Sequence, residues 1–230
     1  MELVPSNIAN HPSVLAHAKR RNKKPSELLL DVSFHYAAMK RLRQHEKRGR
    51  PDIVHFSVLE ALSSPLNKEG QLETWIHTVE DNVIKVAPET RLPRNYLRFL
   101  GLMEQLFREK KIPPEGQPLL EMDALSLRGL VDRLRPTRLV AFSTIGQPST
   151  FEEICRGLAD TDRPAVIIGG FAKGHLSEEN LRLADQVFSV DRDCLDSWVV
   201  TSRVIYEYEC AIKDFHKCRL SGIPYRSQLN

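Results

Sequence analysis

The sequence predicts an α/β fold in which a parallel β-sheet is covered by helices on both faces. Three short runs, rich in β-branched and aromatic residues, have the length of buried strands: TRLVAFST (137–144), PAVIIGG (164–170) and DQVFSV (185–190). Helical patterns precede, separate and follow them, at 124–135, 150–159, 177–184 and from about 195 onward. Strands that alternate with helices of this length form parallel sheets, because each connection crosses a face of the sheet.

The first predicted strand and helices follow a basic N-terminal stretch. LLLDVSFH (28–35) has the pattern of a buried strand, and it leads into an amphipathic helix, HYAAMKRLRQHEK (35–47). A further helix is expected at about 53–63. These residues therefore predict a strand followed by two helices.

A hairpin and a long helix are predicted next. QLETWIHT (71–78) alternates like a half-buried strand, and NVIKVA (82–87) follows after a short turn, so the two are expected to pair. PRNYLRFLGLMEQLFREK (93–110) is strongly amphipathic, and Pro93 suits the first turn of a helix. The segment IPPEGQP (112–118) is the best internal boundary.

The bulk composition indicates a globular protein. With 230 residues, 41% of them hydrophobic and 27% charged, the chain can bury a core as one domain or two small ones. No apolar run reaches the ~20 residues of a membrane helix, and the N-terminus lacks the apolar core of a signal peptide, so we expect a cytoplasmic protein without a membrane partner. The four cysteines form no CxxC pair, so no metal site is expected; they are Cys155, Cys194, Cys210 and Cys218.

Ligands of open parallel sheets bind at loops beyond the carboxyl ends of the strands. Here those loops are STIGQP, GGFAKGH and SVDRDCLDS. Gly169, Gly170 and Gly174 in the second loop let a backbone approach a ligand, but a tight turn explains them equally, and their spacing is not the dinucleotide pattern GxGxxG. The acids of the third loop have a structural interpretation as helix caps and first-turn residues; they are Asp191, Asp193 and Asp196.

Two basic segments are candidates for binding RNA. Between Lys40 and Arg50 lie six Lys or Arg residues and a single acid, Glu46. Such a run is often only a solvated helix face. In the second segment Arg94 and Arg98 are four residues apart, and Arg91 precedes Pro93. Three arginines that meet at a helix N-terminus make a reasonable phosphate site, because amides and dipole there favour anions.

Several motifs in order closely resemble the nucleolar essential protein family of ribosome biogenesis: RPDIVH, SSPLNKEG, TWIHT, VAPETRLPRNYLRFLGLMEQL and IIGGFAKG. The resemblance runs from about residue 26 to residue 212. It implies a single SPOUT-class methyltransferase domain over residues 1–230, with a C-terminal trefoil knot and the hairpin as an addition to the core. The knot would be an exception to the unknotted rule. An RNA-contacting half at about 26–111 would precede a cofactor-binding half at about 119–218.

The resemblance also implies function. Members transfer a methyl group from S-adenosylmethionine to N1 of a pseudouridine in small-subunit ribosomal RNA, and they work as homodimers. The partner RNA is expected to present a hairpin loop, because sequence-specific readers target splayed bases. Ribosomal proteins or assembly factors are further candidate partners. Two alternatives from other classes stay open: a non-enzymatic assembly factor that binds ribosomal RNA, and a nicotinamide-binding oxidoreductase.

By the same resemblance, residues of three loops are candidates for cofactor binding. The cofactor set is Ser143, Thr144, Gly169, Gly174, His175, Leu176, Arg192, Asp193, Cys194, Leu195, Asp196 and Ser197. Cys194 stands where a proline is expected in many relatives. The candidates for RNA binding are Arg50, Arg91, Arg94 and Arg98.

Asp52 has two possible roles. N1 of a neutral pseudouridine carries a proton that must leave, so Asp52 is a candidate general base. However, Arg48 and Arg50 beside it favour the ionised carboxylate, which makes a poorer base. We therefore expect Asp52 to accept hydrogen bonds from Arg50 and to fix its guanidinium group for the RNA. His55 is a secondary candidate for the base, although an ordinary helix position explains it equally.

Overall fold

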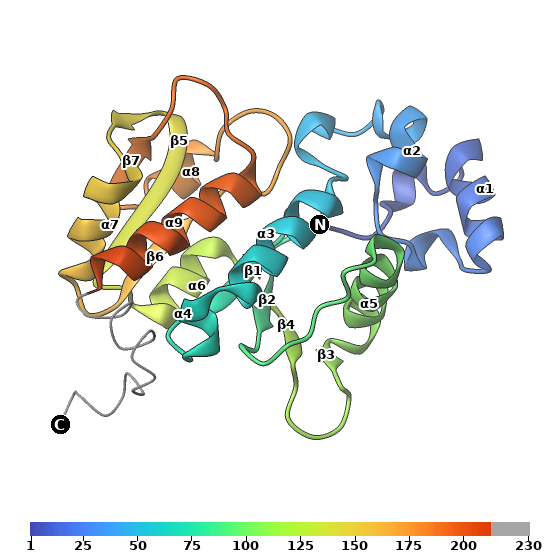
Figure 1. The fold of residues 1–230 in the computed structure, drawn as a ribbon. Coiled ribbons are helices and arrows are strands. Elements are labelled where there is room, and N and C mark those ends of the chain that lie inside the picture. The colour runs from blue at the N-terminus through green and yellow to red at the C-terminus, as the bar shows by residue number, and fades with distance from the viewer. Residues whose placement is uncertain (213–230) are drawn as a thin grey trace.

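A computed structural model describes residues 1–212. It contains two sheets, and the strands of the first precede those of the second in the sequence. Figure 1 shows the parallel sheet with α7 and α9 on one side of the molecule, α1 and α2 at the opposite end, and α3 between them. The elements of the N-terminal half are α1 (Pro12–Arg21), α2 (Val32–Met39), α3 (Pro51–Ser63), α4 (Pro65–Lys68), β1 (Thr74–His77), β2 (Asn82–Val86), α5 (Tyr96–Glu109), β3 (Lys111–Ile112) and β4 (Leu120–Ala124), with short 3-10 turns at Ser6–Ile8, Pro25–Glu27 and His45–Lys47. Those that follow are α6 (Leu127–Leu134), β5 (Arg138–Pro148), α7 (Phe151–Ala159), β6 (Pro164–Ile167), α8 (Glu178–Leu181), β7 (Gln186–Ser189) and α9 (Ser197–Ala211).

The second sheet confirms the predicted parallel arrangement. Its strand order is β6-β5-β7, and β5 pairs in parallel with both neighbours. Val140 and Phe142 of β5 pack against α7 and against Val200 of α9. Leu139 faces the opposite side, near α6 and Leu183, which follows α8. Helices therefore cover both faces, as is usual for a parallel sheet.

The first sheet has the order β1-β2-β4-β3 and is antiparallel throughout. The predicted pairing of β1 with β2 is present, with Thr74 opposite Val86. The strands β3 and β4 were not predicted, because β3 has two residues and β4 reads LEMDA, which carries two acids. The segment 112–118 connects these two strands, so the sheet continues past it to Ala124.

The predicted strand at 28–35 is wrong. Leu28, Leu29 and Leu30 are buried, but only an isolated bridge joins Leu29 to Leu3. A helix begins at Val32 instead, because the Asp31 carboxylate accepts a hydrogen bond from the Ser33 amide and caps it. That helix ends at Met39, well before the predicted end at residue 47.

Helix α5 begins later than predicted. Asn95 caps it by accepting from the Arg98 amide at 3.1 Å, so Pro93 lies before the helix and not in its first turn. Its buried face, which includes Phe99, Leu100 and Met103, forms the core beneath the antiparallel sheet. This packing fixes the start of α5 relative to α3 and the sheet.

The described residues contain neither a membrane-spanning helix nor a metal-binding cluster. No helix among residues 1–212 is long and apolar enough to cross a membrane, and no cluster of His, Cys, Asp and Glu within them could hold a metal ion. Cys155 is buried and its thiol pKa is raised by burial to about 12, whereas Cys194 and Cys210 are exposed. Cys218, and the predicted cofactor-binding half beyond residue 212, lie outside the described residues.

Candidate functional site

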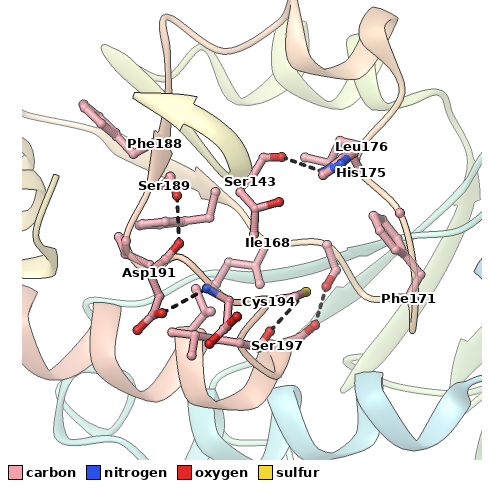
Figure 2. A pocket seen from close by; sticks show the side chains of 18 of the residues that line it. Ser143, Ile168, Phe171, His175, Leu176, Phe188, Ser189, Asp191, Cys194 and Ser197 are labelled. Carbon is pink, nitrogen blue, oxygen red and sulfur yellow. Dashed lines mark hydrogen bonds between the residues drawn. The ribbon is translucent and has the colours of Figure 1, made fainter. Parts of the chain in front are cut away.

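Three segments at the carboxyl-terminal side of the parallel strands line one pocket. They are a bulge within β5, the loop after β6 and the loop after β7. Figure 2 shows Ser143, His175 and Leu176 on one side of this pocket, with Asp191, Cys194 and Ser197 across from them. Residues from three separate parts of the chain therefore meet at the edge where parallel α/β sheets bind their ligands.

The first segment bulges out of β5. Phe188 of β7 pairs with both Phe142 and Gln147, so the four residues between these two lie outside the ladder. Ser143 and Thr144, two candidates for cofactor binding, belong to this bulge and line the pocket. Gly146 closes the bulge, and a β-carbon there would lie 2.5 Å from the Phe188 carbonyl carbon. The close approach of the two backbones thus requires glycine.

The loop after β6, residues 169–176, is hereafter called the glycine loop. Gly169, Gly174, His175 and Leu176 all line the pocket. Gly174 has a φ of +87°, which favours glycine. The His175 ring nitrogen Nδ1 lies 3.2 Å from the Ser143 hydroxyl, which joins this loop to the β5 bulge.

The loop after β7 supplies the acidic side of the pocket. Asp193, Cys194, Leu195 and Ser197 line it, whereas Arg192 and Asp196 do not. The Ser197 hydroxyl donates to the Gly169 carbonyl and so joins this loop to the glycine loop. Of the three aspartates interpreted as helix caps or first-turn acids, only Asp196 occupies the N-cap position of α9. Its side chain makes no capping hydrogen bond.

Two further polar lining residues, one at the end of β7 and one in the loop after it, were not among the predicted cofactor residues. Ser189 and Asp191 line the pocket. The Asp191 carboxylate accepts from the Asp193 amide at 3.0 Å, and the Ser189 hydroxyl donates to the Asp191 carbonyl at 3.0 Å. The alternation of strand and helix located the loop, but it carried no signal for which side chains point inward.

The chemistry of the lining limits what it can bind. Hydroxyl groups, two carboxylates and exposed backbone stand beside apolar walls such as Ile168 and Leu195, and no Lys or Arg lines the pocket within the described part of the chain. Pyrophosphate is bound by cations or by a helix N-terminus with a glycine-rich turn. The lining instead suits an uncharged or cationic ligand that has a flat apolar part and hydroxyl groups.

Arg50 and Asp52 form the ion pair that the sequence predicts. The Arg50 Nε and Nη2 atoms donate to the Asp52 carboxylate at 2.8 and 2.7 Å, and both side chains are about one-third exposed. The hydrogen bond to Asp52 raises the pKa of Arg50, and the charge of Asp196 in the loop after β7 adds to this effect. Arg50 therefore lies within electrostatic reach of the loop after β7.

Arg48 does not contribute to this pair. Its guanidinium group donates to the buried carboxylate of Glu2 and lies 3.5 Å from Glu80. The sequence placed Arg48 beside Asp52 because the two are close along the chain. The structure assigns Arg48 to anchoring the N-terminus.

The remaining arginines lie at the start of α5. Arg91 and Arg94 precede the helix, Arg98 is in its first turn, and all three are exposed. None of them makes an ion pair with any residue from 1 to 212, so their charge is available to a ligand. The hydroxyl group of Tyr96, between Arg94 and Arg98, donates to Asp31. This contact directs Tyr96 into the protein.

His55 is a packing residue. It is 1% exposed, stacks on Phe99 with ring centroids 4.2 Å apart, and its Nε2 atom lies 2.7 Å from the Pro93 carbonyl oxygen. Burial lowers its pKa. A histidine enclosed in this way does not reach a substrate, so its helix interpretation is the appropriate one.

Lys47 connects the basic segment to the pocket, and the sequence singled it out only as one member of the basic run. Its Nζ atom donates to the His175 carbonyl and lies 5.3 Å from the ring centre of Phe171. A β-carbon at Gly174 would lie 2.9 Å from the Lys47 Cε atom. The segment that carries Arg50 is thus attached directly to the glycine loop.

The fold and the pocket define a class of protein. Three parallel strands close their loops on one ligand pocket, beside a segment of partly exposed arginines, which is the arrangement of an α/β protein that can hold a small ligand next to a polyanion. The model of the EMG1/NEP1 methyltransferase family matches residues 1–209. The chain belongs to this family.

Relatives agree over nearly the whole chain. A ribosomal RNA small subunit methyltransferase Nep1 from Staphylothermus marinus is 46% identical over 206 residues, which are 89% of each chain. One from Thermococcus onnurineus is 43% identical over 91% of this chain and 94% of its own. The crystal structure of Archaeoglobus fulgidus Nep1 bound to S-adenosylhomocysteine has a TM-score of 0.81 and 42% identity, and covers 91% of this chain and 93% of the other.

Proposed function

We propose that this protein transfers a methyl group from S-adenosylmethionine to N1 of a pseudouridine in small-subunit ribosomal RNA. The observation that carries the proposal is the convergence of the β5 bulge, the glycine loop and the loop after β7 on one pocket. Its support from outside the chain is the similar fold of a relative bound to S-adenosylhomocysteine.

The pocket fits the proposed cofactor. The apolar walls suit an adenine ring, and the hydroxyl and carboxylate groups of Ser189 and Asp191 suit a ribose diol. The carboxylate of Asp193 and the lack of lining cations within residues 1–212 favour a positively charged sulfonium. When bound, the cofactor supplies an electrophilic methyl group.

The arginines would hold the RNA. Arg50, Arg91, Arg94 and Arg98 offer guanidinium groups that bind phosphates and base edges by paired hydrogen bonds. Asp52 would act on Arg50, because its carboxylate fixes the plane in which the guanidinium lies. The nucleophile is N1, which in uridine is occupied by the glycosidic bond, and holding it in line with the methyl group removes a large entropic cost. Asp52 as the acceptor of the N1 proton is the less favoured role.

The proposal includes the architecture of the family. We propose a single SPOUT domain over residues 1–230 with a C-terminal trefoil knot, in which the β1–β2 hairpin is an addition to the core. We further propose a cytoplasmic homodimer, in which arginines of one subunit can face the pocket of its partner. Lys47 and Arg50 also approach the loops of their own chain. Size-exclusion chromatography with light scattering tests the dimer.

The decisive experiment measures methyl transfer to a short ribosomal RNA hairpin that carries either pseudouridine or uridine at the target position. Labelling of the pseudouridine hairpin alone is expected. Comparable labelling of the uridine hairpin would contradict the assigned chemistry. A thermal shift assay with S-adenosylhomocysteine accompanies it, with NAD as the control ligand. If saturating S-adenosylhomocysteine does not raise the Tm, the result favours a ribosomal RNA assembly factor that does not methylate. If NAD raises the Tm, the result favours an oxidoreductase.

A further inference from the structure

The positive charge of the chain is concentrated at its N-terminus. Residues 1–50 contain eleven of the 33 Lys and Arg residues but only four of the 30 Asp and Glu residues. The first 50 residues therefore carry a formal charge of +7, whereas the remaining 180 carry −4. A charge segregated in this way attracts a polyanion to one end of the molecule.

The acids of this segment do little to neutralise it. Glu2 and Asp31 are 3% and 1% exposed. Glu2 is held in the ion pair with the guanidinium of Arg48, and Asp31 accepts from the Tyr96 hydroxyl. Only Glu27 and Glu46 are exposed. The exposed charged side chains of residues 1–50 are therefore mostly cations, six Lys or Arg against two Glu.

Five of the six exposed cations of residues 1–50 lie in the last turn of α1 or within four residues after the end of α2. They form what we call the α1–α2 basic surface, made of Lys19, Arg20, Lys40, Arg41 and Arg43. None of these five side chains makes an ion pair with another residue in the described range 1–212. The surface therefore presents five charges to a partner, in contrast to Arg21 and Lys23, which both pair with the buried Glu104.

Two aromatic rings accompany these charges. The Lys40 ammonium group lies 5.2 Å from the ring centre of Tyr36, which is 61% exposed, and the Arg20 guanidinium lies 5.3 Å from the ring centre of Phe34. An exposed aromatic ring beside cations is the arrangement on which single-stranded nucleic acids stack their bases. An acidic protein would use the charges but has no particular need of the ring.

The α1–α2 basic surface is held in place relative to the arginines at the start of α5. His17 of α1 lies 2.9 Å from His35 of α2, ring nitrogen to ring nitrogen, in the buried interior. Asp31, which caps α2, accepts a hydrogen bond of 2.5 Å from Tyr96, the first residue of α5. A ligand held by Arg94 and Arg98 is therefore held by the same rigid unit that carries the basic surface.

We propose that the α1–α2 basic surface is a second RNA-contacting surface, which binds the phosphates of the strands that flank the target loop, with Tyr36 as a stacking ring for an unpaired base. This inference rests on the proposed function, and it assigns the arginines around α5 to the loop and the basic surface to the RNA beyond it. Contacts of this kind position a substrate without reading its sequence.

The test compares two RNAs that share the target loop, a minimal hairpin and one extended by its natural flanking strands. Fluorescence anisotropy measures the Kd of each over a range of salt concentrations. The test protein carries Lys19→Gln, Lys40→Gln and Arg43→Gln. The control carries Lys68→Gln, Lys111→Gln and Arg128→Gln, which remove the same charge from exposed positions elsewhere. Thermal unfolding of each protein confirms that it folds.

The test substitutions are expected to weaken binding of the extended RNA about tenfold or more in ~0.1 M salt. They should also reduce the magnitude of the slope of log K against log salt by roughly 2, because each phosphate contact contributes about 0.7 to 0.9 to that slope. Binding of the minimal hairpin should change less than threefold, as should both RNAs with the control protein. An unchanged affinity and slope for the extended RNA, or an equal loss with the control, would overturn the proposal and favour an acidic protein as partner. Binding is measured without methyl transfer, so failure of the proposed chemistry would be seen separately.

Discussion

Gly146 is the position at which the sequence most directly controls the shape of the pocket. It closes the β5 bulge against β7, and a β-carbon there would lie 2.5 Å from the Phe188 carbonyl carbon, 2.7 Å from the Phe188 nitrogen and 2.7 Å from the Val187 oxygen. Carbon atoms pack at about 3.5 to 4.0 Å, so Gly146→Ala requires the strands to separate by about 1 Å. All three neighbours are backbone atoms, and none can rotate away.

The expected cost of Gly146→Ala is about 3 kcal/mol of unfolding free energy, at the upper end of the range for overpacking. For a chain of this size that is a fall of roughly 6 to 12 °C in Tm. Because Ser143 of the bulge and Phe188, which pairs with the residues on both sides of it, line the pocket, affinity for S-adenosylhomocysteine should fall at least tenfold by isothermal titration calorimetry. Gly101→Ala is the control, since its β-carbon would meet nothing within 4 Å and it lies inside α5.

The control is expected to be stabilised by about 0.5 to 1 kcal/mol, as alanine is favoured over glycine in a helix. A Gly146→Ala protein that matched the control in urea-unfolding free energy and kept its cofactor affinity would refute the reasoning. It would mean that the bulge can shift freely, and that the pocket does not depend on the approach of these two strands.

Asp52→Asn removes the charge that orients Arg50, and we expect RNA affinity to fall about tenfold together with the methylation rate; intact RNA binding with the rate abolished would instead support Asp52 as the general base. Lys47→Met removes a charged donor to the glycine loop. Because the contact is partly exposed, the binding free energy of S-adenosylhomocysteine should weaken by about 1 kcal/mol, or roughly fivefold in affinity by calorimetry. An unchanged affinity would show that the contact does not shape the pocket. Burial, followed by the neighbouring His17, lowers the pKa of His35 to about 4 from 6.5. The unfolded chain therefore binds more protons between these values, so stability should be full above pH 6.5 and decline as the pH falls toward 4. A His35→Phe protein should show a shallower decline in urea unfolding, and an equally steep one would assign the loss to other groups.

Much of the pocket lining could be predicted from the sequence, because parallel strands place their following loops at one edge. The family prediction is confirmed, and ten of the twelve candidate cofactor residues line the pocket. The two that do not are Arg192 and Asp196. Spacing along the loop determines which segment reaches the pocket, but the direction of each side chain depends on local turns such as that of Asp191 with Asp193.

The errors in the N-terminal half have a common physical cause. A continuous apolar run such as Leu28 to Leu30 is equally suited to a strand and to any other fully buried segment, so local pattern does not decide between them. Here the decision comes from Glu104, far along the chain, whose buried carboxylate accepts from the Leu29 amide at 3.2 Å. Arg48 was misplaced for the same reason, since its partner Glu2 is 46 residues away. Long-range polar contacts of this kind leave no local signature.

The partition of charge suggests how the two proposed ligands are kept apart. The pocket is lined by Asp191 and Asp193 and by no Lys or Arg within the described residues, so it repels phosphates and favours a cationic cofactor. The arginines that would hold the RNA lie outside it, and Lys47, which is not among the lining residues, contacts the glycine loop at the His175 carbonyl and the Phe171 ring. An RNA approaching this surface would keep its phosphates on the arginines while an uncharged base enters the acidic pocket. Ser189→Lys places a cation at the pocket. It should lower the affinity for S-adenosylmethionine, which carries the sulfonium charge, more than the affinity for S-adenosylhomocysteine, whose sulfur is neutral. Equal losses of affinity by calorimetry would show that the lining acts through shape and not through charge.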